Sequence, residues 1–438
     1  MYWLWAYSLK DFLLYCLLTG LWASGGWLIG NHAFRIKPVE RILTGLGTGL
    51  VLFIVFSDWL AHFLPLTFAF WAAAGAVLAL GLVAAWRSPR RPRIDWKDWH
   101  SFPQLLALLS LTLLFAYILR GLAIFDEYLH LPMISVMAAG DIPPHFYLTP
   151  QFYFAYHYSL QVLAASLVRL GNLTPWSAWD LSRAVAIALT LVLGWLWIKR
   201  ATRSTLAAYL GTILLTFAGG VRWFLLLVPS SWLARLTEDV PLIIPDPRIG
   251  TDLIALLHHP WALEGAGVVK YPFAFHSGIF VPAFFSLGST GALPFVTIFL
   301  LLLLLPRRRF TAIGWVTWCS LFASLALSAE HTFAAIWGGM FLAIGFTFLR
   351  NSFRLPRIKR TIQVQWIGLL GVSLVLAIVQ GGFITEAVRN VLAPFFGGIA
   401  AEDINVHGFG LRLPPGLYSA HFGVLSLFEK GSLCVLLT

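Results

Sequence analysis

Long apolar stretches alternate with short polar connections along almost the whole chain. A membrane-spanning helix needs about 20 predominantly apolar residues, and ten stretches reach or approach that length. They cover residues 11–30, 42–61, 66–86, 102–124, 181–198, 206–228, 293–305, 310–328, 332–349 and 366–383. A further run that begins near Ser419 is still apolar at Thr438, which leaves open whether the chain continues. The pattern predicts an all-α fold, a polytopic transmembrane helix bundle of about 10–11 spans whose long outer loops carry interfacial helices.

The composition agrees with this class. Of the 438 residues, 59% are hydrophobic and only 11% are charged. A water-soluble domain of this size could not bury that much apolar surface, so the lipid bilayer is the expected partner of the helices. The formal net charge of +11 is spread over short clusters between the apolar stretches. Nucleic-acid binding would gather that charge on one soluble patch, so we expect no nucleic-acid partner.

The basic clusters also predict the topology. Lys and Arg accumulate in cytoplasmic loops, and the chain has such clusters at residues 35–41, 87–97, 199–203, 307–309 and 350–360. Alternation of the spans then places five regions outside, at residues 58–65, 125–180, 229–290, 330–331 and 384–418. We therefore expect a multi-pass protein of the plasma membrane whose active site, if it has one, faces outside.

One segment does not fit this alternation. Residues 153–170 are apolar enough to cross, but a full crossing would turn the basic cluster at 199–203 outward. The segment is therefore predicted to be an amphipathic or re-entrant helix at the outer interface, rich in Tyr and His. A true span, with another stretch wrongly taken as one, is the alternative.

The first large outer loop begins with two adjacent acids. Asp126 and Glu127 directly follow the apolar residues 102–124, and an acid pair at the mouth of a membrane helix is costly to place. If Asp126 begins a helix, its charge favours the helix N-terminus, and His130 lies one turn along on the same face. A solvated helix end is the alternative interpretation.

A turn and an aromatic segment follow the acids. Gly140-Asp141 precedes Pro143-Pro144 and His145, which is typical of a turn that leads into an extended segment. Asp141 alternatively only caps a helix or turn. Aromatic residues and histidines dominate residues 146–158, and Arg183 stands at the head of the next apolar stretch.

This order of motifs resembles the GT-C superfamily of membrane glycosyltransferases, in particular the branch of protein O-mannosyltransferases and lipid A aminoarabinose transferases. That branch has an Asp-Glu pair after a span, a Gly-Asp and Pro-containing stretch, an aromatic segment, a Gly, and an Arg that opens the next helix. The resemblance covers roughly residues 102–203 and is weaker after residue 228. Where the branch carries Pro-Pro-Leu or Glu-Lys-Pro-Pro, this chain reads Gln151-Phe152-Tyr153-Phe154-Ala155-Tyr156-His157-Tyr158, which leaves the substrate open.

The resemblance and the apolar stretches together divide the chain into four parts. Residues 1–101 are predicted to form N-terminal transmembrane helices, and residues 102–228 a GT-C-like core that includes the first outer loop, 125–180. Residues 229–290 are predicted to form a second outer loop with an interfacial helix, and residues 291–438 the C-terminal transmembrane helices.

The resemblance implies an enzyme that moves a sugar from a polyprenyl-phosphate donor to an acceptor at the outer face, with inversion. It implies that Asp126 is the base that takes the proton of the acceptor hydroxyl, and that Glu127 orients the acceptor or assists a metal. Arg183 is the implied candidate for stabilising the leaving phosphate. Oxygen-rich sites can hold Mg²⁺ or Mn²⁺, but the mannosyltransferase branch does not need one, so the metal, the sugar and the acceptor all stay open.

Further residues are candidates for substrate binding because a sugar site needs flat aromatic faces and carboxylates. Besides Arg183 they are Asp141, His145, Tyr153, His157, His258, Lys270, Glu330 and His331. An acid at a membrane edge, such as Glu330, is a functional candidate by default, although pairing with a structural Arg is the alternative. The spacing of the histidines in the first outer loop matches no strong metal-ligand signature, which favours interfacial packing.

Two other functions compete with the enzyme. A transporter or flippase should have acids or broken helices near the bilayer middle and repeated halves, whereas the sequence has few charges deep in its spans. A non-catalytic membrane scaffold would tolerate the replacement of Asp126 and Glu127.

Overall fold

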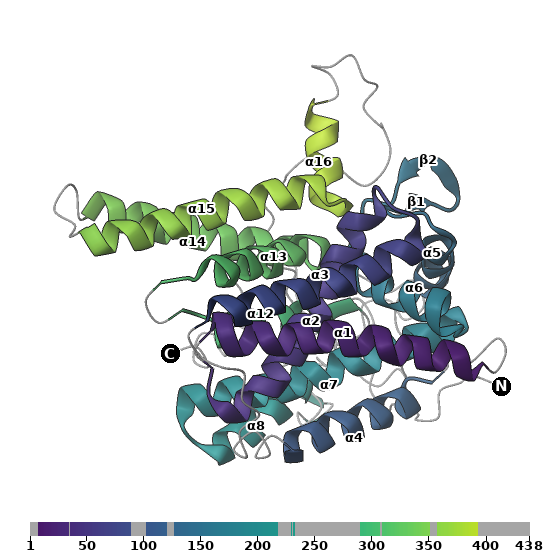
Figure 1. The fold of residues 1–438 in the computed structure, drawn as a ribbon, viewed down its shortest axis with the longest axis horizontal. Helices are drawn as coiled ribbons and strands as arrows, with labels where there is room; N and C mark the ends of the chain where they lie inside the picture. The colour runs from purple at the N-terminus through teal and green to yellow at the C-terminus, as the bar shows by residue number, and fades with distance from the viewer. Residues whose placement is uncertain are drawn as a thin grey trace.

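The computed structural model describes residues 8–34, 36–88, 102–120, 127–217, 229, 231–232, 290–306, 309–350 and 357–392. Most of this part of the chain is helical, and it contains one antiparallel hairpin (Figure 1). The helices are α1 (Leu9–Ala33), α2 (Pro38–Ala61), α3 (Leu66–Arg87), α4 (Phe102–Ile118), α5 (Glu127–Ala139), α6 (Ser159–Gly171), α7 (Pro175–Thr202), α8 (Thr205–Phe217), α12 (Ala292–Leu303), α13 (Ala312–Ser328), α14 (Glu330–Arg350), α15 (Arg357–Val379) and α16 (Gly382–Leu392). The strands are β1 (His145–Phe146) and β2 (Thr149–Tyr153).

The helices follow the apolar pattern of the sequence. Each of the ten predicted stretches overlaps a helix, namely α1, α2, α3, α4, α7, α8, α12, α13, α14 and α15. Within the described ranges, α1, α2, α3 and α7 are long and apolar enough to cross a membrane, and α15 with α16 would make a fifth span that is bent by 81°. These helices agree with the predicted all-α membrane bundle, to which the small hairpin is an addition.

Glycines allow α1 to pack closely against α2 and α3. A Cβ added to Gly26 of α1 would lie 2.2 Å from the carbonyl oxygen of Gly45 and 2.4 Å from the amide nitrogen of Gly49 in α2. A Cβ added to Gly25 would lie 2.5 Å from the carbonyl oxygen of Val77 in α3. Small residues of this kind let membrane helices approach backbone to backbone, so the first three helices form a closely packed unit.

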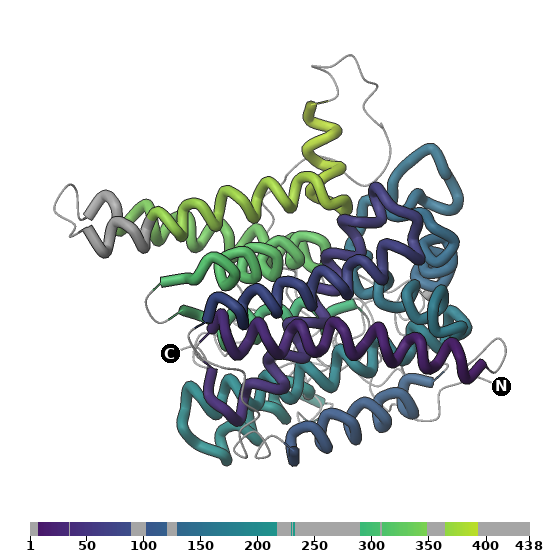
Figure 2. Tube along the Cα trace, viewed as in Figure 1, coloured from purple at the N-terminus to yellow at the C-terminus, as the bar shows by residue number. Residues whose placement is uncertain are grey.

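The helix α7 organises the middle of the chain. It packs against α4, α6, α8 and α12, and most of its residues from Ser177 to Leu196 are buried. The hydroxyl of Thr190 lies 2.9 Å from the carbonyl oxygen of Ala292, at the start of α12. Figure 2 shows α14 and α15 as a further pair that run side by side.

The structure corrects the prediction for residues 153–170. Strand β2 extends to Tyr153, and the helix α6 begins only at Ser159. Its 13 residues span about 20 Å at about 1.5 Å per residue, short of the roughly 30 Å hydrocarbon core, so α6 does not make a full span. Most of α6 is buried against α1, α2, α5 and α7; its place at the outer interface stays a prediction.

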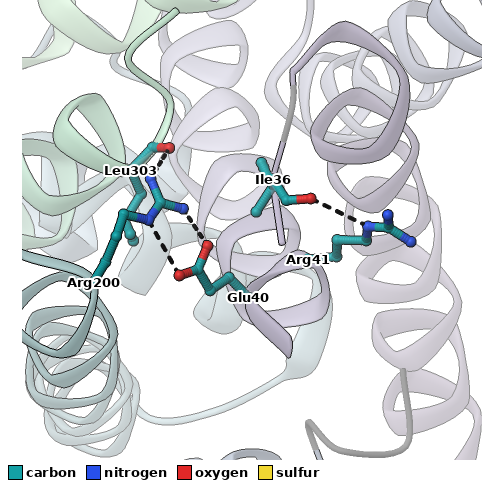
Figure 3. A network of polar contacts seen from close by, with 5 residues as sticks. All are labelled: Ile36, Glu40, Arg41, Arg200 and Leu303. Carbon is teal, nitrogen blue, oxygen red and sulfur yellow. Dashed lines mark hydrogen bonds and ion pairs between the residues drawn. The ribbon is translucent and has the colours of Figure 1, made fainter. Parts of the chain in front are cut away.

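The basic clusters around Arg41 and Arg200 lie at one end of the bundle. At this end α1, α7 and α12 finish, and α2 and α13 begin. Two contacts hold these helix ends together: Arg200 of α7 forms an ion pair with Glu40 of α2, and it donates to the carbonyl oxygen of Leu303 in α12 at 2.7 Å. The hydroxyl of Thr311 lies 3.3 Å from the carbonyl oxygen of Ala33. Figure 3 shows the guanidinium of Arg200 between its two partners. We call this region the basic end; its assignment to the cytoplasm stays a prediction.

Glycine packing predicts a large difference between two alanine substitutions. Gly26→Ala should destabilise the protein by about 1–3 kcal/mol or more, because the new methyl group meets backbone atoms that cannot move aside. Gly75→Ala is the matched control in α3, since an added Cβ there has no atom within 4 Å. It should be neutral or stabilising by up to about 1 kcal/mol. Thermal unfolding in detergent measures both, and equal unfolding temperatures would contradict close packing of α1 and α2.

The ion pair at the basic end predicts an energetic coupling between α2 and α7. Glu40→Gln and Arg200→Gln should each lower the unfolding temperature, and the double variant should lose less than the sum, with a coupling energy of about 0.5–3 kcal/mol. Arg203→Gln, at an exposed position of the same region, is the control and should have little effect. A coupling of zero would mean that the pair does not hold the two helices together.

Candidate functional site

A pocket lies at the end of the bundle opposite the basic end. Its cavity has a volume of about 310 Å³ and is formed where α2 and α5 finish, at the hairpin, and at the junction of α15 with α16. The residues that line it are His62, Gly140, Asp141, Ile142, Pro143, His145, Tyr153, Phe154, Val379, Gly381, Gly382, Thr385, Glu386 and Arg389. We call it the rim pocket. It combines carboxylates, imidazoles, an aromatic ring and a guanidinium at the end of apolar helices.

Asp141 and His145 form the most defined polar pair of the rim pocket. One carboxylate oxygen of Asp141 lies 2.7 Å from Nδ1 of His145, and the other accepts the His145 backbone N–H at 2.8 Å. Both contacts are local, because the turn after α5 brings His145 back to the carboxylate of Asp141, four residues earlier. The predicted turn at Gly140-Asp141 is thus present, and Gly140 adopts a φ of 124°, which favours glycine. Two predicted substrate-binding residues therefore lie in one pocket.

Tyr153 joins this pair to α16. The register of the hairpin places Tyr153 opposite His145, and their rings stack with centroids 4.3 Å apart. The guanidinium of Arg389 lies 4.6 Å from the centre of the Tyr153 ring and forms an ion pair of 2.7 Å with Glu386. A third predicted substrate-binding residue thus lines the pocket, next to a carboxylate and a cation that the motifs did not indicate.

The wall of the rim pocket rests on buried hydrogen bonds. The fully buried Tyr158 hydroxyl lies 3.1 Å from a carboxylate oxygen of Asp58 in α2 and 3.2 Å from the carbonyl oxygen of Gln380. His62 approaches the same helix, with Nδ1 2.8 Å from the carbonyl oxygen of Asp58. A carbonyl can only accept, so Nδ1 of His62 carries the hydrogen. In the sequence, Asp58 is recognisable only as an acid near the end of a predicted span, and Tyr158 only as one of many aromatic residues.

A second polar group lies deeper, outside the rim pocket. Nδ1 of His157 and a carboxylate oxygen of Glu330 are 3.7 Å apart, within ion-pair range but too far for a hydrogen bond. Within the described part of the chain, Glu330 therefore faces a histidine and not the structural Arg that was the alternative. His331 is exposed in the first turn of α14 and does not line the pocket.

Arg183 is fully buried in α7. It forms an ion pair with Asp180 one turn earlier and lies over the ring of Trp179, 5.4 Å from its centre. His130 packs on the same Trp179 ring at 5.0 Å, and Gln161 holds its Nδ1 at 2.9 Å. The structure thus separates Arg183 from the rim pocket, and its predicted contact with a phosphate stays a prediction.

Several predicted site residues fall elsewhere. Asp126, His258 and Lys270 lie outside the described residues, and α5 begins at Glu127, of which only the backbone is described. Among the side chains that the structure describes, no three His, Cys, Asp or Glu residues are placed to hold a metal ion.

Comparison with known proteins identifies no relative of this chain. No family model matches the chain, and the searches of curated proteins and of solved structures found no matching protein. The resemblance to GT-C glycosyltransferases therefore stays a prediction from motifs.

The buried His130 predicts that stability depends on pH. In α5, outside the candidate spans, burial and the nearby charges of His157 and Arg183 lower the pKa of His130 from 6.5 to about 3. Above pH 6.5 the ring is neutral in both the folded and the unfolded state. Between the two values the unfolded state binds a proton that the folded state excludes. The free energy of unfolding should therefore decrease as the pH is lowered from 6.5 towards 3, by at most about 1.4 kcal/mol per pH unit.

Thermal unfolding of the detergent-solubilised protein, measured from neutral pH to about pH 4, tests this slope. His130→Asn should flatten it, since asparagine does not titrate, whereas His331→Asn at an exposed position should leave it as in the wild type. Equal slopes in all three proteins would show that the buried imidazole is not what limits stability in acid.

Proposed function

We propose that the protein is a membrane glycosyltransferase. It transfers a sugar from a polyprenyl-phosphate donor to an acceptor hydroxyl at the outer face of the plasma membrane, by an inverting displacement with a carboxylate base. The rim pocket is the observation that carries this proposal, because half of its lining residues come from the segment whose motifs resemble the GT-C branch. It also has the groups that a sugar and a phosphate need.

The walls of the rim pocket suit a sugar and its leaving group. Carboxylates bind sugar hydroxyls, and a sugar face packs against an aromatic ring; Asp141, Glu386 and Tyr153 provide these groups. Arg389, with about half of its side chain exposed (51%), brings a guanidinium to the same wall. A fixed cation of this kind stabilises the charge that develops on a departing phosphate.

A row of exposed apolar residues on α15 supports a lipid-linked donor. Helical periodicity places these residues on one face of α15. They are Val364, Ile367, Val372, Val375 and Val379. Exposed apolar residues face lipid on any membrane helix, but this row ends at Val379, which lines the rim pocket. A polyprenyl chain lying along α15 would thus bring its phosphate to the polar wall.

A lipid transporter or flippase is the second candidate. Transporters use broken helices and buried acids near their substrate sites. The 81° bend between α15 and α16 and the fully buried Asp58 beside it are features of this type. The two functions differ in their product, because a transporter returns the lipid-linked sugar unchanged.

The proposed function predicts sugar transfer by the purified protein. Wild-type protein in nanodiscs should transfer sugar from a polyprenyl-phosphate donor to an acceptor hydroxyl, with inversion at the anomeric carbon. Asp126→Asn should lower the rate by about 10²–10⁴-fold, the usual contribution of a general base. Asp11→Asn is the matched control, since Asp11 lies in the first turn of α1 and does not line the rim pocket.

Equal transfer by wild type and Asp126→Asn would show that Asp126 is not the base. Absence of transfer from every donor, together with movement of the lipid-linked sugar across proteoliposomes, would favour the transporter.

A further inference from the structure

We propose that His145, oriented by Asp141, is the proton donor to the leaving phosphate in the rim pocket. This inference rests on the proposed glycosyl transfer and adds a role that neither the motifs nor the resemblance assigns. His145 would be a catalytic residue, because its ring nitrogen contacts the reacting group, and Asp141 a positioning residue.

The hydrogen bonds of His145 show which ring nitrogen Asp141 engages. An ionised carboxylate only accepts hydrogen bonds, so Nδ1 of His145, 2.7 Å from Asp141, carries a hydrogen. Nε2 is therefore the nitrogen that can exchange a proton with a ligand. The second oxygen of Asp141 accepts the His145 backbone N–H at 2.8 Å, so the carboxylate is held by the same residue that it orients.

The ring of His145 is also held in place by packing. It stacks on Tyr153 with an interplanar angle of 28°, and the hairpin pairs the two residues across its strands. About a third of the side chain stays exposed (35%), so a ligand can reach it. An oriented and accessible imidazole that bonds a carboxylate through Nδ1 is the arrangement used by proton-transferring histidines.

The groups that surround His145 suit a proton donor to an anion. Asp141 bonds its Nδ1, and Glu386 of α16 lines the same cavity. Arg389 and His62 face the same cavity from α16 and α2, and Tyr153 from β2. The guanidinium makes this wall suited to an anion, so the group most suited to receive the proton is a phosphate oxygen.

His62 does not share this arrangement. Its Nδ1 donates to the backbone carbonyl of Asp58 and not to a carboxylate. His157 faces a carboxylate, but at 3.7 Å and outside the lining of the rim pocket. Among the described histidines that line the rim pocket, only His145 has the carboxylate contact.

The step balances in atoms and charge. The oxygen of the acceptor hydroxyl bonds to the anomeric carbon, and its proton passes to the carboxylate base. The bond from the anomeric carbon to the phosphate oxygen breaks, and its electron pair stays on that oxygen. The proton on Nε2 of His145 then neutralises this charge, leaving a neutral imidazole that Asp141 keeps in position.

The pH dependence of transfer tests the proposal. A proton donor must be protonated, so wild-type kcat/KM should fall on the alkaline side. His145→Gln should lose about 10²–10⁴-fold in kcat and no longer show that alkaline limb. Asp141→Asn keeps an oxygen that can accept the backbone N–H, so the turn should survive. Because the carboxylate that orients the ring is lost, kcat should fall with little change in KM.

Matched controls separate this role from a merely structural one. His32→Gln, in the last turn of α1 at the basic end, and Asp11→Asn should keep the rate and pH profile of the wild type. Unfolding temperatures should show that both pocket variants are folded. If wild type transfers sugar and His145→Gln retains its rate and alkaline limb, the proposal is overturned.

A binding readout distinguishes failure of this proposal from failure of the proposed function. Acylation of His145 by a histidine-selective reagent, followed by mass spectrometry, should slow when polyprenyl phosphate is present in the nanodisc. If inorganic phosphate slows the acylation of His145 equally, the phosphate group alone makes the contact. If only polyprenyl phosphate slows it, the lipid chain also contributes to binding. Protection without any transfer would contradict the enzyme but retain the phosphate contact, whereas acylation unchanged by either ligand overturns that contact.

Discussion

The buried hydroxyl of Tyr158 is the contact on which the rim pocket depends. It joins Asp58 of α2 to the carbonyl oxygen of Gln380, where α15 turns into α16. A buried hydroxyl without a partner costs about 1–3 kcal/mol, so the bend is favoured where it meets this group. Gly381 is required there, because an added Cβ would lie 2.3 Å from the Tyr158 oxygen, and its φ of 104° is unfavourable for other residues. The bend in turn carries Glu386 and Arg389 to Tyr153.

The glycine contacts at the other side of α2 provide a rigid base for this junction. Gly45 and Gly49 fix α2 against α1, and the same helix continues to Asp58 and His62 at the rim pocket. At the basic end, Glu40 is held by Arg200 of α7. One helix is therefore anchored at its start, its middle and its end. This anchoring explains how a pocket made by four separate segments can keep a defined geometry.

The sequence predicts the helices well and the long-range pairs poorly. Runs of about 20 apolar residues are readable because the bilayer sets their length. Asp141 and His145 were also found, since they lie four residues apart in one turn. Tyr158 and Gln380 are 222 residues apart, so no local pattern reports their contact. The segment before α6 was taken as helix because its Tyr and His residues are apolar enough, whereas the structure continues a strand to Tyr153. Glu386 and Arg389, three residues apart on one helix, were the signal that sequence reasoning missed.

The burial of cations decides which residue can meet a phosphate. Arg183, the candidate from the motifs, has no exposed side-chain surface and is paired with Asp180. Breaking a buried pair costs about 3–5 kcal/mol, so a phosphate contact through Arg183 would require α7 to rearrange. Arg389 is half exposed, and its partner Glu386 lies at the pocket wall. A phosphate can approach that guanidinium from its exposed side. We therefore expect the role that the motifs give to Arg183 to fall to Arg389, with Arg183 holding α7 and the ring of Trp179 in place.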